Sequence, residues 1–169
     1  MRLTPIALSV AFALATMASA GHGQRADSQI DPRSTALLQQ GQALTASAQF
    51  DQAIDTLESA LAVDPRNRAA YVALARVAQG QKLPGKVIRL YGEALKLEPN
   101  DPTALAGQGE ALVQRGAIER AKRNLEKLKT ACSGACPQAT TLAAVIAKGP
   151  PAEAIAARVP EAAPKTEKN

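Results

Sequence analysis

The sequence repeats itself at a spacing of 34 residues, and this repetition restricts the fold more than any other feature of the chain. The stretch FDQAIDTLESALAVDPRN at residues 50–67 is echoed by PGKVIRLYGEALKLEPND at 84–101 and by IERAKRNLEKLKTACSGA at 118–135. A fixed period of this length indicates stacked structural units. Because one unit cannot bury its apolar face alone, about three of them are needed for a stable core. Three copies are present.

The three copies align when repeats begin at Ser34, Arg68 and Pro102. An early large apolar position, a small position four residues later and two apolar positions in the second half then coincide. These positions hold Leu37, Tyr71 and Leu105, then Gly41, Ala75 and Gly109, then Ala53, Val87 and Ala121, then Leu57, Tyr91 and Leu125. The pattern resembles the tetratricopeptide repeat family, whose 34-residue units also carry a late proline. That proline is Pro65 and Pro99 here, and Ser133 replaces it in the third copy, which suits a terminal repeat.

The resemblance implies an all-α fold, a right-handed superhelical stack of three helix-turn-helix repeats at 34–67, 68–101 and 102–135. Two Asp-Pro pairs, Asp31-Pro32 and Asp101-Pro102, and Asn67 are predicted to begin the first helices, because a side-chain oxygen caps the N-terminus and proline tolerates the first helical position. The apolar spacing over 137–148 predicts a short capping helix. The proline-rich residues 149–169 are predicted to form a disordered tail.

The first twenty residues have the pattern of a cleavable signal peptide. Arg2 precedes an apolar run from Ile6 to Ala15, and Ala18-Ser19-Ala20 matches a small-residue cleavage site. The run is short for a bilayer span, so an uncleaved anchor is the weaker interpretation. We therefore expect residues 21–33 to form a linker in a periplasmic protein, with secretion as the alternative, and no membrane span after cleavage.

A glycine-rich stretch, Gly80 to Val87, reads G-x-x-x-x-G-K but does not predict a nucleotide site. Val87 stands where a phosphate-binding loop needs a hydroxyl for Mg²⁺, and the preceding residues favour a helix over a strand. We interpret the glycines and Pro84 as turn residues between the two helices of the second repeat, with Pro84 and Gly85 opening the second helix. Nucleic acid is not an expected partner either, because the +5 chain has only two Phe, two Tyr and no Trp for base stacking.

In the family that the sequence resembles, partners bind in a concave groove lined by the first helix of each repeat. The resemblance places nine residues there, namely Leu38, Gln42, Thr45, Val72, Arg76, Gln79, Ala106, Glu110 and Val113. The family's carboxylate-binding clamp needs several Lys, Asn and Arg side chains, and only Arg76 is cationic here. An extended peptide or a helix held by apolar contacts and amide hydrogen bonds is the expected partner. Ordinary solvated side chains are the alternative.

The most charged segment, residues 115–129, is a second candidate contact surface. Its cations are Arg115, Arg120, Lys122, Arg123, Lys127 and Lys129, against Glu119 and Glu126. This basic helix could contact an acidic protein or an anionic membrane surface. The alternative is a solvated helix on which Glu119 pairs with Arg123, and Glu126 lies near Lys122 and Arg123.

Cys132 and Cys136 are the only cysteines, and an even count in an exported protein favours a structural disulfide between them. A metal site would need further ligands. His22, the only histidine, would follow Gly21 at a new terminus and offers a minor hypothesis of copper binding.

The sequence shows no nucleophile placed beside a base. We therefore expect neither enzymatic activity nor a bound cofactor. Two main hypotheses of function remain. The first is a periplasmic adaptor or scaffold that binds an envelope protein or peptide through the groove. The second is an assembly or stabilising subunit of an envelope complex that uses the basic helix at 115–129 and the tail.

Overall fold

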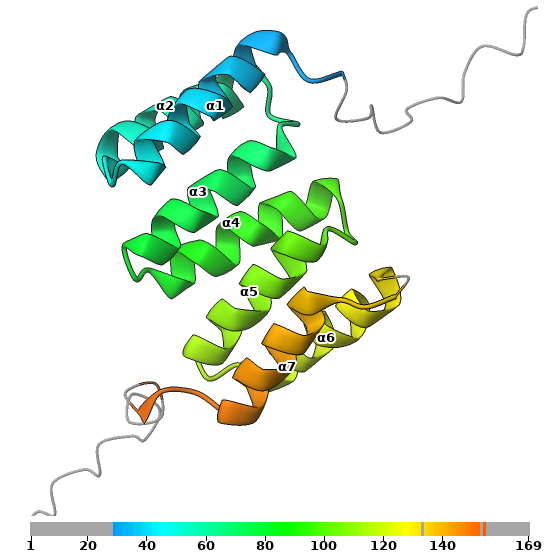
Figure 1. Cartoon of the computed structure of the whole chain (residues 1–169). Helices are drawn as coiled ribbons and strands as arrows, with labels where there is room; N and C mark the ends of the chain where they lie inside the picture. The colour runs from blue at the N-terminus through cyan, green and yellow to red at the C-terminus, as the bar shows by residue number, and fades with distance from the viewer. Residues whose placement is uncertain (1–28, 133, 153, 155–169) are drawn as a thin grey trace, which may run out of the picture.

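The computed structural model describes residues 29–132, 134–152 and 154, and within them the chain is entirely helical with no strand (Figure 1). Its seven named helices are α1 (Pro32–Ala46), α2 (Phe50–Val63), α3 (Arg68–Gly80), α4 (Pro84–Leu97), α5 (Pro102–Gln114), α6 (Ile118–Ala131) and α7 (Pro137–Lys148). None of these helices is both long and apolar enough to cross a membrane. The predicted signal peptide, His22 and most of the predicted tail lie outside the described residues.

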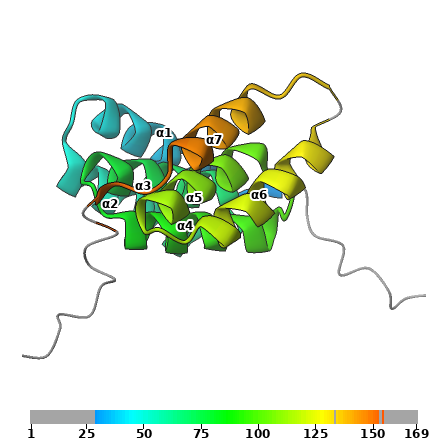
Figure 2. The same cartoon turned by 90° about the horizontal axis from the view of Figure 1, so that it is seen from below.

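The helices pack as successive hairpins, α1 with α2, α3 with α4 and α5 with α6. Helix α3 packs against α2 and α1 of the first hairpin, and α5 packs against α4 of the second. Helix α7 packs in the same way on α5 and α6, and it spans the residues predicted for the terminal helix. In the view of Figure 2, α1 and α7 lie above α3 and α5, and α4 lies below them. The predicted all-α stack is confirmed.

The first helix of each hairpin begins where the capping residues predicted it. The Asp31 carboxylate accepts the Arg33 N–H at 2.8 Å, the Asn67 side chain accepts the Ala70 N–H at 3.2 Å, and the Asp101 carboxylate accepts the Ala104 N–H at 2.7 Å. Pro32 and Pro102 follow their caps at the first helical position. These side chains satisfy backbone donors that the first turn leaves without partners.

The turn inside each hairpin depends on one residue in the left-handed conformation, and this residue is not the one we predicted. Ala48, Lys82 and Gly116, which are 34 residues apart, have φ of 58°, 56° and 66°. Only the third turn uses glycine at this position. Gly80 instead ends α3, so its assignment to the turn was wrong, whereas Pro84 and Gly85 do open α4 as predicted.

A shared hydrogen bond holds all three turns. The residue after the left-handed position donates to a carbonyl five residues back, over 2.9, 2.9 and 2.7 Å, in the pairs Gln49 to Leu44, Leu83 to Ala78 and Ala117 to Leu112. This arrangement satisfies carbonyls at the helix end and offsets the roughly 1 kcal/mol that a non-glycine residue loses there.

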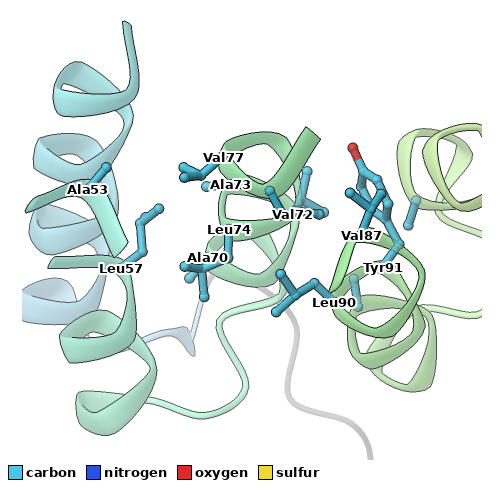
Figure 3. Close-up of a cluster of buried hydrophobic side chains, with 14 of the residues drawn as sticks. Ala53, Leu57, Ala70, Val72, Ala73, Leu74, Val77, Val87, Leu90 and Tyr91 are labelled. Carbon is cyan, nitrogen blue, oxygen red and sulfur yellow. The ribbon is translucent and has the colours of Figure 1, made fainter. Parts of the chain in front are cut away.

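The small positions of the repeat allow close packing in two different directions. A Cβ added to Gly41 would lie 2.5 Å from the Leu57 side chain, so α1 and α2 depend on glycine at this contact. Gly109 instead faces Leu142 of α7, at 2.6 Å from an added Cβ. In Figure 3, Leu57 points from α2 toward α3, with Val87, Leu90 and Tyr91 of α4 on the other side of α3. The buried apolar residues of the first two hairpins therefore form one cluster, which also includes Ala104 and Ala111 of α5.

Consecutive repeats are joined by buried polar contacts at equivalent positions. The Ser34 hydroxyl donates to the Ala60 carbonyl at 2.7 Å and accepts the Asn67 amide at 2.8 Å. An ion pair between Arg68 and Asp101 occupies the same two positions one repeat later. The two contacts link the start of each repeat to the start of the next.

Asp64 braces the loop between the first two repeats. Its carboxylate accepts the Asp31 N–H at 3.1 Å and the Arg66 N–H at 3.0 Å, and forms an ion pair with the Arg66 guanidinium at 2.8 Å. Burial alone would raise the pKa of this carboxyl, but these hydrogen bonds and the Arg66 charge together hold the pKa below its ordinary value. The ionised form of Asp64 therefore stabilises the folded chain.

A Gly41→Ala substitution should destabilise the protein by about 1 to 3 kcal/mol, because the added methyl collides with Leu57 in the packed core. The matched control is Gly85→Ala, where nothing lies within 4 Å of an added Cβ. The control should gain up to about 1 kcal/mol from helix propensity. Denaturant unfolding measures both, and equal effects at the two positions would contradict the close contact.

Replacing Asp64 with asparagine should lower the free energy of unfolding at pH 7 by about 1 to 3 kcal/mol, because a charged buried acceptor is lost. Since the folded-state pKa is depressed, the contribution of Asp64 is complete above its ordinary pKa near 3.8 and is lost as the pH falls through the lower folded value. The difference in unfolding free energy between the wild type and Asp64→Asn should therefore become smaller as the pH is lowered below 3.8. The exposed Asp55→Asn is the control, and a gap independent of pH would refute the role of ionisation.

Candidate functional site

The nine residues predicted to line the groove divide into a buried floor and an accessible row. Leu38, Val72 and Ala106 are 9%, 7% and 7% exposed, one on each of α1, α3 and α5. Val113 is 2% exposed and lies in a cluster against which Val145 and Ile146 of α7 pack, so it is a core residue and is not accessible to a partner. The accessible row contains Gln42 and Arg76, which are exposed, and Thr45, Gln79 and Glu110, which are half-buried.

The centre of this row contains a residue that the sequence analysis assigned only to packing. Tyr91 comes from α4, and its hydroxyl donates to the Gln79 side chain of α3 at 3.1 Å. Its ring lies directly against Gly107 of α5, where an added Cβ would collide with it. In Figure 3 the hydroxyl oxygen lies at the edge of the apolar cluster. The equivalent positions in the other two repeats are Leu57 and Leu125. Because a buried tyrosine needs a hydrogen-bond partner, the tyrosine at residue 91 was the sequence signal for a polar contact here.

Two opposite charges flank the Tyr91 hydroxyl. Burial raises the pKa of the phenol, the Arg76 guanidinium acts against this and the Glu110 carboxylate adds to it. Burial also raises the pKa of Glu110 above its ordinary value. Within the part of the chain that the structure describes, no side chain forms an ion pair or hydrogen bond with the Glu110 carboxylate. The centre of this row therefore holds one cation, one phenol and one anion without an ion-pair partner among the described residues.

The basic helix α6 is accessible, but its ion pairs differ from those expected. Glu119 pairs with Lys122 at 2.8 Å and Glu126 pairs with Lys129 at 2.9 Å, in both cases three residues along the helix. Residues at this spacing share one helix face, so each carboxylate meets its nearest cation there. The exposed cations Arg120, Arg123 and Lys127 form no ion pair with any described residue. A positive surface remains available on α6.

A disulfide joins Cys132 and Cys136, as the cysteine count predicted. Cys132 follows the last residue of α6 and Cys136 precedes the first residue of α7, so the bond ties these two helix ends together. A hollow of about 480 Å³ lies beside it and is lined by Lys129, Cys132, Gly134, Cys136, Ala139, Thr140 and Ala143. Among the described residues there is no group of three or more side chains that could hold a metal ion.

Comparison with known proteins finds a sequence match for the repeat and structural matches for the helical stack. Residues 34–77 match the family model of the tetratricopeptide repeat. The comparison with curated protein sequences finds no match.

Solved structures share the fold at low sequence identity. The first tetratricopeptide domain of Spaghetti (RPAP3), bound to the HSP90 peptide SRMEEVD, is 20% identical with a TM-score of 0.63, over 69% of this chain and 91% of that one. The Sgt2 domain from Aspergillus fumigatus is 22% identical with a TM-score of 0.64, over 70% and 79%. The Yersinia enterocolitica type III secretion chaperone SycD, with a peptide of the translocator YopD, is 15% identical with a TM-score of 0.59, over 68% and 86%.

The match at residues 34–77 covers the first hairpin and most of α3, and the structural matches extend over most of the described stack. Residues 34–77 therefore match a tetratricopeptide repeat in sequence, and the described stack has the fold of tetratricopeptide domains.

Proposed function

We propose that this chain is a non-enzymatic adaptor that binds a peptide segment of another protein across its first helices. The observation that carries the proposal is the accessible row of polar side chains on α1, α3 and α5, above a buried apolar floor. Gln42, Gln79 and Arg76 offer amide and guanidinium donors to a peptide backbone, while the floor fixes the helices that present them. From here this row, with Tyr91 at its centre, is called the groove.

The peptide complexes among the similar structures support this proposal. Spaghetti (RPAP3) is bound to an HSP90 peptide and SycD to a peptide of YopD, so the fold presents a peptide-binding surface in both. The groove of this chain carries a single cation, Arg76, and a carboxylate, Glu110. We therefore expect a partner segment that is not anchored by its C-terminal carboxylate alone.

The proposed place of action is the bacterial cell envelope, in the periplasm. The support is the N-terminal sequence, in which Arg2, an apolar run and Ala18-Ser19-Ala20 follow the order of a secretory signal. An intrachain disulfide between Cys132 and Cys136 agrees with an oxidising compartment.

A second candidate function is favoured by the surface of α6. Arg120, Arg123 and Lys127 are exposed and form no ion pair with described residues, so an acidic partner could bind them without breaking existing contacts. In this case the chain is an assembly or stabilising subunit that contacts its complex through the basic helix.

Site-specific photocrosslinking in cells should distinguish the two surfaces. A probe at Gln42 or Gln79 should capture one discrete partner, because these side chains lie on the accessible row of the groove. Probes at Lys122 on α6 and at Arg89, an exposed residue of α4, are the comparison positions. Capture from Lys122 alone would refute the groove assignment and favour the subunit role.

The intact mass of the protein from an envelope fraction tests its location and its disulfide together. We expect the loss of residues 1–20, and no alkylation of Cys132 or Cys136 until a reductant is added. An unprocessed mass would contradict export with cleavage. Alkylation without reductant would contradict the disulfide in cells.

A further inference from the structure

Glu110 lies half-buried at the centre of the groove and has no cation of its own among the described residues. Its burial already opposes its charge, as the raised pKa shows. A partner that covers the groove must remove more water from this carboxylate. Burying a charge is strongly unfavourable unless an opposite charge pairs with it, so the partner has to supply that charge.

Arg76 does not fill this role. It occupies the position on α3 that Glu110 occupies on α5, 34 residues later. Both residues are described by the structure, and they form no ion pair with each other; the Arg76 charge acts on the Tyr91 hydroxyl instead. The position one repeat further along, on α7, is Ala144, which carries no charge. Neither equivalent position, Arg76 on α3 or Ala144 on α7, therefore compensates the charge of Glu110 in the groove.

From these charges we infer that the groove selects an extended partner segment with a Lys or Arg side chain over Glu110 and an Asp or Glu side chain over Arg76. The Tyr91 side chain spans from Gly107 of α5 to Gln79 of α3, so these two first helices lie on the order of 10 Å apart. An extended chain advances about 3.3 Å per residue, so the two charges are roughly three residues apart. The Tyr91 hydroxyl lies between them. This inference rests on the proposed function, because it names the partner chemistry of the same groove.

The test is selection of a phage library of random twelve-residue peptides on the purified full chain. Enriched peptides should contain a basic and an acidic residue about three positions apart. Binding of an enriched peptide should weaken about tenfold in Glu110→Gln, which keeps the shape of the side chain but removes the charge that pairs with the peptide. The control Glu58→Gln changes an exposed carboxylate on α2 and should leave binding unchanged.

Charge reversal adds a second readout. Glu110→Lys places two cations in the groove and should enrich peptides with two acidic residues and no basic one. Circular dichroism and unfolding of each variant confirm that the stack remains folded before binding is compared.

The possible outcomes separate this inference from the proposed function. If peptides are enriched and lose binding in Arg76→Glu, yet contain no basic residue and bind Glu110→Gln as tightly as wild type, the inference is wrong and the groove function stands. If no peptide is enriched, or if binding is unaffected by every groove substitution, the proposed function fails and the inference fails with it.

Discussion

The stack depends on the joint between one repeat and the next. Ser34 and Asn67 form this joint between the first two repeats, and Arg68 and Asp101 form it at the same positions between the second and third. In both cases the capping residue of the next first helix also holds the start of the preceding repeat. Because a buried polar group is costly without its partner, each joint favours the relative placement of the hairpins that keeps its contact. The arrangement of the groove follows from that placement.

The third repeat lacks this joint. Pro102 and Ala135 stand at the corresponding positions and cannot form a side-chain hydrogen bond or ion pair with each other. A disulfide between Cys132 and Cys136 connects α6 to α7 instead, and Leu142 of α7 packs directly against Gly109. The covalent bond and the apolar contact thus replace the polar joint at the end of the stack. Helix α7 consequently covers the face of α5 and α6 that a further repeat would otherwise cover.

Tyr91 combines an apolar packing contact with a polar contact at the centre of the groove. Gly107 leaves room for the Tyr91 ring, and the ring carries the hydroxyl from α4 to Gln79, between the charges of Arg76 and Glu110. One aromatic residue of the second helix therefore reaches the face formed by the first helices. The apolar residues assigned to the groove form its floor, and Val113 lies beneath α7. Fewer of the predicted groove residues are accessible to a partner than the alignment of the repeats indicates.

The sequence by itself determined the helices and their order, because the 34-residue period, the capping residues and the apolar spacing are local properties of the chain. It also indicated the disulfide, since Cys132 and Cys136 have no other cysteine to pair with. Only the tertiary structure decided the left-handed turn at Lys82, because the packed helices on either side hold a non-glycine residue in that conformation. It also placed Tyr91 in the groove and left Glu110 without a compensating cation. Those two features depend on contacts between different helices. The tyrosine at a leucine position signalled only that its hydroxyl needs a partner, and not which helix supplies it.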